Sequence, residues 1–172
     1  MGKTLTATTD VRLKWEHTNT PDAGGPIIND HNTFTLADSL ANGTGADSAD
    51  LLWHDVRTLS ATSDETIDIA GGITDQFGAT VTFGKIRGLV VRNQSTTAGA
   101  ILDVGGASSN EFTSWVGAAG DTVKVYPNGC LFLWNPSAAA YAVTAGSADN
   151  LKINNGSSAE ITYQIVLIGS SS

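Results

Sequence analysis

The chain has 172 residues, enough for one domain with a sizeable core. Its formal net charge is −8 with only nine Lys and Arg residues, so it would repel a phosphate backbone and we expect no nucleic-acid partner. Hydrophobic residues make up 41%, charged residues 15%, and there are 19 glycines, which excludes a disordered chain and predicts a turn-rich fold.

Residues 1–32 differ from the rest of the chain. The stretch TLTATTDVRLKW alternates apolar and polar side chains and can form a strand in which Leu5, Val11, Leu13 and Trp15 carry the apolar positions. The polar loop EHTNTPDAGGPIINDHN follows, with two prolines and a Gly pair. Two interpretations stay open: a mobile or partner-bound arm, or an edge strand of the following domain over residues 4–15.

The next segment, TLADSLA, carries the clearest helical pattern in the chain. Leu36 and Leu40 form an i, i+4 apolar pair there. One such pair makes a helix too short to be stable without tertiary support. The sequence therefore predicts little helix.

From Leu51 onward the apolar residues recur mostly with a period of two, which is typical of strands with one buried face. The segment ITYQIVLI places apolar side chains on both of its faces and predicts a long strand that is covered on both sides. The segments ETIDI, TVTF and TVKVY predict strands with one face toward water. Further strands are expected at 51–59, 85–93, 100–104, 130–134, 141–144 and 151–154.

Between these segments lie short runs of Gly, Asn, Pro and Ser, which favour turns. The clearest is YPNGC at Tyr126–Cys130, which predicts a tight hairpin between two strands. Many short strands separated by turns, at intervals of about 8 to 12 residues, predict an all-β fold. We expect an antiparallel β-sandwich or jelly roll of about 8 to 10 strands over residues 33–172.

The sequence offers little material for catalysis, which needs a nucleophile or an acid–base pair in one pocket. His54 and Asp55 are neighbours on a predicted strand, so their side chains point apart. His17, His31 and His54 lack the spacing of a zinc site, and Cys130 is the only cysteine, which leaves no cysteine zinc site or disulfide within the chain. We expect no catalytic residue, no metal and no cofactor.

Two groups of acidic residues could in principle form a calcium site or a glycosidase site. Asp38, Asn42, Asp47 and Asp50 are oxygen ligands of the kind that calcium takes, but they lack the spacing of a calcium loop and indicate a solvated loop. A glycosidase needs two carboxylates that face each other across a cleft. Asp103 and Glu111 form the nearest pair, and nothing in the sequence brings them together.

The four tryptophans are expected to divide between core and surface. Trp53 and Trp134 lie on predicted strands and are expected in the core. Trp15 and Trp115 lie in or beside loop-like segments, so they are candidates for contact with another chain. The candidate interaction residues are Leu5, Val11, Leu13, Trp15 and Trp115.

The start of the chain, MGKTLTATTD, lacks the apolar core of a signal peptide. No run approaches the roughly 20 apolar residues that cross a bilayer. We therefore expect neither export nor membrane insertion, and synthesis in a reducing cytoplasm.

From about Thr33 to Gly169 the sequence resembles a family of small virion structural proteins of tailed bacteriophages. The resemblance is carried by GTGAD and LWHD.RTL, by DIAGGITD.FGATVTF.KI, and further on by VYPNG, Y.VTAGSADNLKI.N and TYQIVLIG. It does not cover the residues before Thr33, and no catalytic residues come with it. It implies a virion component made in the bacterial host cytoplasm.

Composition and resemblance together favour a capsid decoration, or cement, protein on the outer capsid surface. Such a protein would bridge neighbouring major capsid subunits, stabilise the head and form homo-oligomers, for which a trimer is the expected state. The alternative is a head-spike or tail receptor-binding domain that recognises a host glycan or protein. The cement interpretation predicts a flat or concave base with an ordered arm, and the alternative predicts an aromatic-lined groove at one end of the sandwich.

Overall fold

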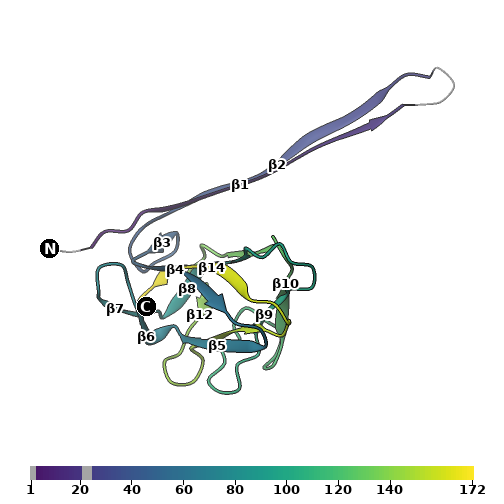
Figure 1. Ribbon diagram of the computed structural model, residues 1–172. Coiled ribbons are helices and arrows are strands. Elements are labelled where there is room, and N and C mark those ends of the chain that lie inside the picture. Colours follow the sequence, from purple (N-terminus) through teal and green to yellow (C-terminus); the bar gives the residue numbers. More distant parts are fainter. Residues whose placement is uncertain (1–2, 21–24) are drawn as a thin grey trace.

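The computed structural model describes residues 3–20 and 25–172, and each regular element in these ranges is a β-strand. The strands form two parts, a β-sandwich and a long two-stranded hairpin (Figure 1). The far end of the hairpin stands clear of the sandwich. No helix in the described ranges has the length and apolarity needed to cross a membrane.

Fourteen strands occur in the described residues. The hairpin consists of β1 (Ala7–Asn19) and β2 (Ile28–Asn42), with the short β3 (Ser48–Ala49) beside the end of β2. The remaining strands are β4 (Leu51–Leu59), β5 (Ser63–Asp68), β6 (Ala70–Thr74), β7 (Thr80–Thr82), β8 (Lys85–Asn93), β9 (Leu102–Gly105), β10 (Thr122–Val125), β11 (Cys130–Trp134), β12 (Tyr141–Ala142), β13 (Asn150–Asn155) and β14 (Ile161–Ser170).

Two antiparallel sheets form the sandwich. One has the strand order β10-β9-β13-β5, and the other has the order β11-β8-β14-β4 with β12 beside β8. The predicted all-β fold is confirmed, and the four and five strands of these sheets agree with the expected number. The jelly-roll alternative is not confirmed by this strand order.

The core lies between the two sheets. In β14 every second side chain is fully buried and the intervening side chains are half-buried, as expected for a strand covered on both sides. The buried positions of β14 are Ile161, Tyr163, Ile165 and Leu167. They pack in one apolar cluster with Leu102, Val104, Leu151 and Ile153 from the opposite sheet.

Several strand positions follow the sequence prediction closely. The expected ranges 51–59, 85–93 and 130–134 coincide with β4, β8 and β11. The prediction for TVKVY holds for Val125, which is buried, but Val123 is exposed. The side chain of Val123 lies on β10, the edge strand of its sheet.

The predicted YPNGC hairpin is wrong. The turn itself forms: Asn128 has a φ of 59° and the amide of Gly129 donates to the carbonyl of Tyr126 at 2.8 Å. It joins β10 of one sheet to β11 of the other, so it is a corner between the layers. A turn signal marks where the chain reverses, and it does not determine which sheet the next strand joins.

The hairpin also corrects two expectations. TLADSLA lies within strand β2, because Leu36 and Leu40 share a strand face as readily as a helix face and pair with Val11 and Ala7 of β1. Strand β2 crosses residue 32, where the sequence was expected to divide into arm and sandwich. The predicted polar loop includes residues 21–24, which lie outside the described residues.

The base of the hairpin is attached to the sandwich by Arg87, whose side chain is fully buried. Its guanidinium donates to the carbonyls of Thr44 and Gly45, at 3.1 and 2.6 Å, in the turn after β2. It also donates to Pro136 at 3.1 Å and to Ser137, in the loop after β11. One side chain therefore joins the root of the hairpin to the sheet below it.

Candidate interaction surface

The arm, defined as strands β1 and β2, has one apolar and one polar face. Residues directly opposite each other in an antiparallel pair share a face. Leu13 pairs with Phe34, Val11 with Leu36, and Trp15 with Asn32. The apolar face therefore carries one continuous group, called the arm stripe below: Val11, Leu13, Trp15, Phe34 and Leu36.

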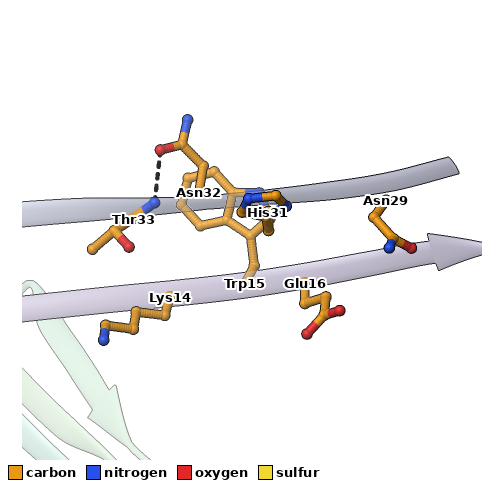
Figure 2. Close-up of a pocket in the computed structure, with 7 residues that line it drawn as sticks. All are labelled: Lys14, Trp15, Glu16, Asn29, His31, Asn32 and Thr33. Atoms are coloured by element: carbon orange, nitrogen blue, oxygen red, sulfur yellow. Dashed lines mark hydrogen bonds between the residues drawn. The ribbon is translucent and has the colours of Figure 1, made fainter.

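The opposite face of the arm is polar. It carries Asp10, Arg12, Lys14, Glu16, Thr33 and Thr35. Figure 2 shows the separation near the far end of the arm, where Trp15 and Asn32 rise on one side of the ribbon and Lys14 and Glu16 extend on the other. One apolar and one polar face are typical of antiparallel strands whose apolar face packs on another layer.

The arm stripe is open to solvent. Leu13 is 62% exposed, Phe34 55%, Trp15 40% and Val11 37%. Each square ångström of apolar surface left in water forgoes about 25 cal/mol of stabilisation. A two-stranded ribbon has no second layer of its own with which to cover this face. The stripe is therefore a candidate contact surface.

The hollow beside Trp15 is not built as a ligand pocket. Lys14, Trp15, Glu16, Asn29, His31, Asn32 and Thr33 line it. The hydrogen bond drawn there runs from the Thr33 amide to the Asn32 side chain at 2.8 Å and is local to β2 (Figure 2). Both walls belong to the same exposed ribbon, so the hollow lacks the enclosure that a small-molecule site needs.

At its root the arm packs on the sandwich. Ala7 and Leu40 are buried there with Ala49, against the half-buried side chains of Trp134 and Ile168. Leu5, expected among the interaction residues, belongs to this packed root, where its amide donates to the side chain of Asn42 at 2.9 Å. Leu5 is therefore used within the chain.

A polar contact accompanies this packing. The indole nitrogen of Trp134 donates to a carboxylate oxygen of Asp38 at 2.9 Å. This bond, together with a second one from the Ser39 amide, lowers the pKa of Asp38 below its ordinary value. Trp134, expected in the core, therefore lies between the arm and the sheet.

The sheet β11-β8-β14-β4 presents a second apolar surface on the side away from the core, called the outer face below. Two rows of cross-strand neighbours form its centre: Phe132, Val90 and Val166, and then Trp134, Gly88 and Ile168. The rings of Phe132 and Trp134 are stacked, with centroids 6.4 Å apart. Thr8, Thr9 and Asp10 overhang this face and enclose a cavity of about 200 Å³.

The other predicted contact residue, Trp115, lies elsewhere. It is partly buried against the main core, and its indole nitrogen donates to the carbonyl of Phe112 at 2.9 Å. Trp53 is 5% exposed and lies in the core, as expected. The structure thus brings together Val11, Leu13 and Trp15, and it separates Leu5 and Trp115 from them.

Phe34 and Leu36 complete the arm stripe and were not among the predicted contact residues. The alternation in HNTFTLA was available as a signal, because Phe34 and Leu36 alternate with Thr33, Thr35 and Ala37. The competing helical pattern of TLADSLA hid it. The outer face was likewise present in the alternation of CLFLW, with Phe132 and Trp134 on one side.

Asp103, Glu111 and Asp50, among the acidic groups considered for chemistry, are occupied by structural bonds. Asp103 pairs with Lys124 at 2.7 Å, whereas Glu111 accepts from the amides of Gly106 and Gly120, both at 2.7 Å. Asp50 accepts from the amide and hydroxyl of Ser171. In residues 3–20 and 25–172, no cluster of three or more His, Cys, Asp or Glu side chains is placed to hold a metal ion.

A small cavity of about 130 Å³ lies beside His54, between the start of the chain and the β6–β7 turn. Lys3 forms an ion pair with Asp75 at its wall, and this contact is the main reason that the pKa of Asp75 is lowered. Phe77, in the turn, is 82% exposed. Asp55, the neighbour of His54, turns away and pairs with Arg57 at 3.0 Å.

No protein-family model, no curated protein and no solved structure matches the chain. The resemblance to virion proteins of tailed bacteriophages thus remains a prediction from the sequence.

Proposed function

We propose that the protein is a non-enzymatic structural protein that attaches to a larger assembly through its arm. The assembly is the head of a tailed bacteriophage, and the protein is a decoration protein on its outer surface. The observation that carries the proposal is the arm stripe, an uncovered apolar face on a hairpin whose far end stands clear of the sandwich (Figure 1).

The length of the arm suits a protein that bridges subunits. Strand β1 has 13 residues, which at about 3.3 Å per residue gives a reach of roughly 40 Å. That distance is comparable to the width of a small domain, so an arm anchored on one capsid subunit can cross to its neighbour. Many identical arms on one lattice add their modest affinities through avidity.

The charge of the chain supports an outer location. A net charge of −8 disfavours contact with packaged nucleic acid. The major capsid protein is the proposed partner, and the protein is also proposed to associate with itself, with a trimer as the expected state.

The receptor-binding alternative is supported by less. It requires an aromatic-lined groove at one end of the sandwich. The cavity lined by Phe132 and Trp134 lies on the outer face of a sheet, beneath the root of the arm. The cavity beside His54 has Phe77 as its one Phe, Tyr or Trp among the described residues. Glycan sites usually stack sugars on aromatic faces and surround them with free polar groups. Both carboxylates of that cavity are already bonded within the chain, Asp75 to Lys3 and Asp50 to Ser171.

The test is binding to purified phage heads that lack the protein. We expect binding to mature, expanded heads and none to unexpanded precursors, and we expect bound protein to raise the temperature at which heads release DNA. The double variant Leu13→Asn and Phe34→Asn should bind about tenfold more weakly or worse, because it makes one cross-strand pair of the stripe polar.

The matched control is the double variant Thr33→Asn and Thr35→Asn, which changes the polar face of the same strand. It should bind heads like the unaltered protein. Absence of binding to mature, expanded heads would refute the decoration role. Equal loss of binding in both double variants would show that the apolar face is not the attachment surface.

A further inference from the structure

We infer that the arm stripe of one copy docks on the outer face of the sheet β11-β8-β14-β4 of a second copy. This goes beyond the proposed function, because it concerns the protein before it meets a capsid. The arm stripe holds one partner at a time, so attachment to a head would exchange the second copy for the capsid surface. Two apolar surfaces of the same chain, one on the arm and one on the sandwich, are its starting point.

The outer face presents an apolar floor at its centre. Gly88 lies at its centre, and a side chain there would approach the ring of Trp134 to 3.2 Å, so the indole lies close over the backbone of β8. Phe132, Val90 and Val166 form the adjoining row and are only half-buried. Val56 of β4, 58% exposed, extends the surface on the far side of β14.

The chain already uses one end of this floor for its own arm. Ala7 and Leu40, at the root of the arm, are buried against Trp134 and Ile168. The row of Phe132, Val90 and Val166 continues the same surface but receives no arm residue beyond the overhanging Thr8–Asp10 segment. A second arm laid along this row would extend an existing arm-to-sheet contact with the same kind of side chains.

The stripe of the same chain does not reach this row. Arg87 and the bond between Trp134 and Asp38 hold the root of the arm in place. Beyond the root the arm runs away from the sandwich (Figure 1), and Leu13 and Phe34 remain 62% and 55% exposed. Since donor and acceptor surfaces do not meet within one chain, a second copy is the partner that carries both.

The available area is sufficient for a stable contact. The part of the arm beyond Asp10 is a ribbon about 30 Å long and about 10 Å wide, and the acceptor sheet measures about 19 by 30 Å. Exchange of two arms along their whole projecting length would bury about 1,200 Å², counted over both partners, and the stripe supplies roughly half of this area. The total is the lower limit of the standard range for specific interfaces. The contact joins two different patches, so it can close as a two-fold exchange or as a ring.

The first experiment measures molar mass by light scattering at micromolar concentrations. The unaltered protein should be a closed oligomer. The donor variant Leu13→Asn with Phe34→Asn should be monomeric, and so should the acceptor variant Phe132→Ser with Val90→Thr. The control variant Thr33→Asn with Thr35→Asn should remain oligomeric. Circular dichroism and thermal unfolding establish that each variant is folded. If the acceptor double variant does not fold, the single variant Phe132→Ser, on the edge strand β11, takes its place.

Mixing the two monomeric variants distinguishes this contact from other modes of assembly. The donor variant keeps its outer face and the acceptor variant keeps its arm stripe, so native mass spectrometry should show a one-to-one complex. Arms that paired edge to edge through the open edge of β1 would instead leave the acceptor variant oligomeric, and that result would overturn the inference. A monomeric unaltered protein would overturn it as well.

Cys130 supplies an independent readout, because it is exposed on β11 and points to the same side as Phe132. Assembly should slow its alkylation in the unaltered protein compared with the donor variant, although the residues around Cys130 are the same in both. If the unaltered protein is oligomeric and Cys130 is nevertheless alkylated at the same rate in both proteins, the contact lies elsewhere. A monomer that still binds phage heads would refute the self-association and leave the proposed function standing.

Discussion

Strands β1 and β14 both carry large apolar residues at every second position, yet these side chains have opposite surroundings. In β14 the apolar side chains Ile165 and Leu167 are fully buried between two sheets. In β1 the equivalent side chains, Leu13 and Trp15, are exposed on a ribbon without a second layer. A period of two thus specifies a strand with an apolar face, and it does not specify what covers that face.

The two strands also differ in their hydrogen-bonded neighbours. β14 lies between β8 and β4 and is paired along most of its length on both edges. β1 is paired with β2 on one edge, and its other edge carries no partner strand within the described residues. The sandwich has pairing and packing of its own, whereas the arm is held to the rest of the chain at its root.

The sharpest test of this comparison is one alanine in each region. Ile165→Ala should lower the free energy of unfolding by about 2–5 kcal/mol, because it opens a cavity in the core. Leu13→Ala should change it by less than about 0.5 kcal/mol in monomeric protein, because the side chain is already in water. Urea unfolding followed by circular dichroism measures both. A large effect of Leu13→Ala would mean that the arm folds against the sandwich.

The link between the regions is tested by Arg87→Met, which keeps the volume of the side chain and removes its donors. Four backbone carbonyls would lose their bonds to the buried guanidinium, so we expect a loss of about 2–4 kcal/mol and faster amide hydrogen exchange at the root of the arm. Arg92→Met, on the exposed side of the same strand, is the control. Unchanged exchange in β2 would show that Arg87 does not hold the arm.

The smallest expected effect concerns a polar bond inside the sandwich. The hydroxyl of Tyr163 donates to Glu65 at 2.5 Å, and burial, followed by this bond, raises the pKa of Tyr163 above 10. Because the folded state holds this proton more tightly than the unfolded state, the stabilisation is complete below pH 10 and is lost as the pH rises beyond it. The loss is about 1.4 kcal/mol per pH unit from this group.

Tyr163→Phe should reduce stability at neutral pH by about 1 kcal/mol and should remove this part of the alkaline decline. Chemical unfolding of both proteins at a series of pH values from 8 upward measures this. The slopes of unfolding free energy against pH should differ from about the ordinary tyrosine pKa upward. Parallel slopes would mean that Tyr163 ionises equally easily in both states. By contrast, the ion pair of Asp10 and Arg12 on the arm is exposed to solvent, so it should contribute little to stability.

Much of the fold could be predicted because it depends on local chemistry. Alternation along the chain marks β4, β8 and β11 to the residue, and Asn128 with Gly129 marks a turn. The same alternation identified Val11, Leu13 and Trp15 as one apolar face. These features follow from strand geometry and from the backbone preferences of single residues, which are present in any short stretch of sequence.

The rest was decided by contacts between residues far apart in the chain. Pairing with β1 makes Leu36 and Leu40 part of a strand and adds Phe34 to the arm stripe. Leu5 was expected at an interaction surface and Trp134 in the core, but both pack at the root of the arm. The YPNGC turn is a corner between the layers because β10 and β11 belong to different sheets. Spacing determines which side chains share a face, and only the assembled tertiary structure determines which surface that face meets, because burial depends on the whole chain.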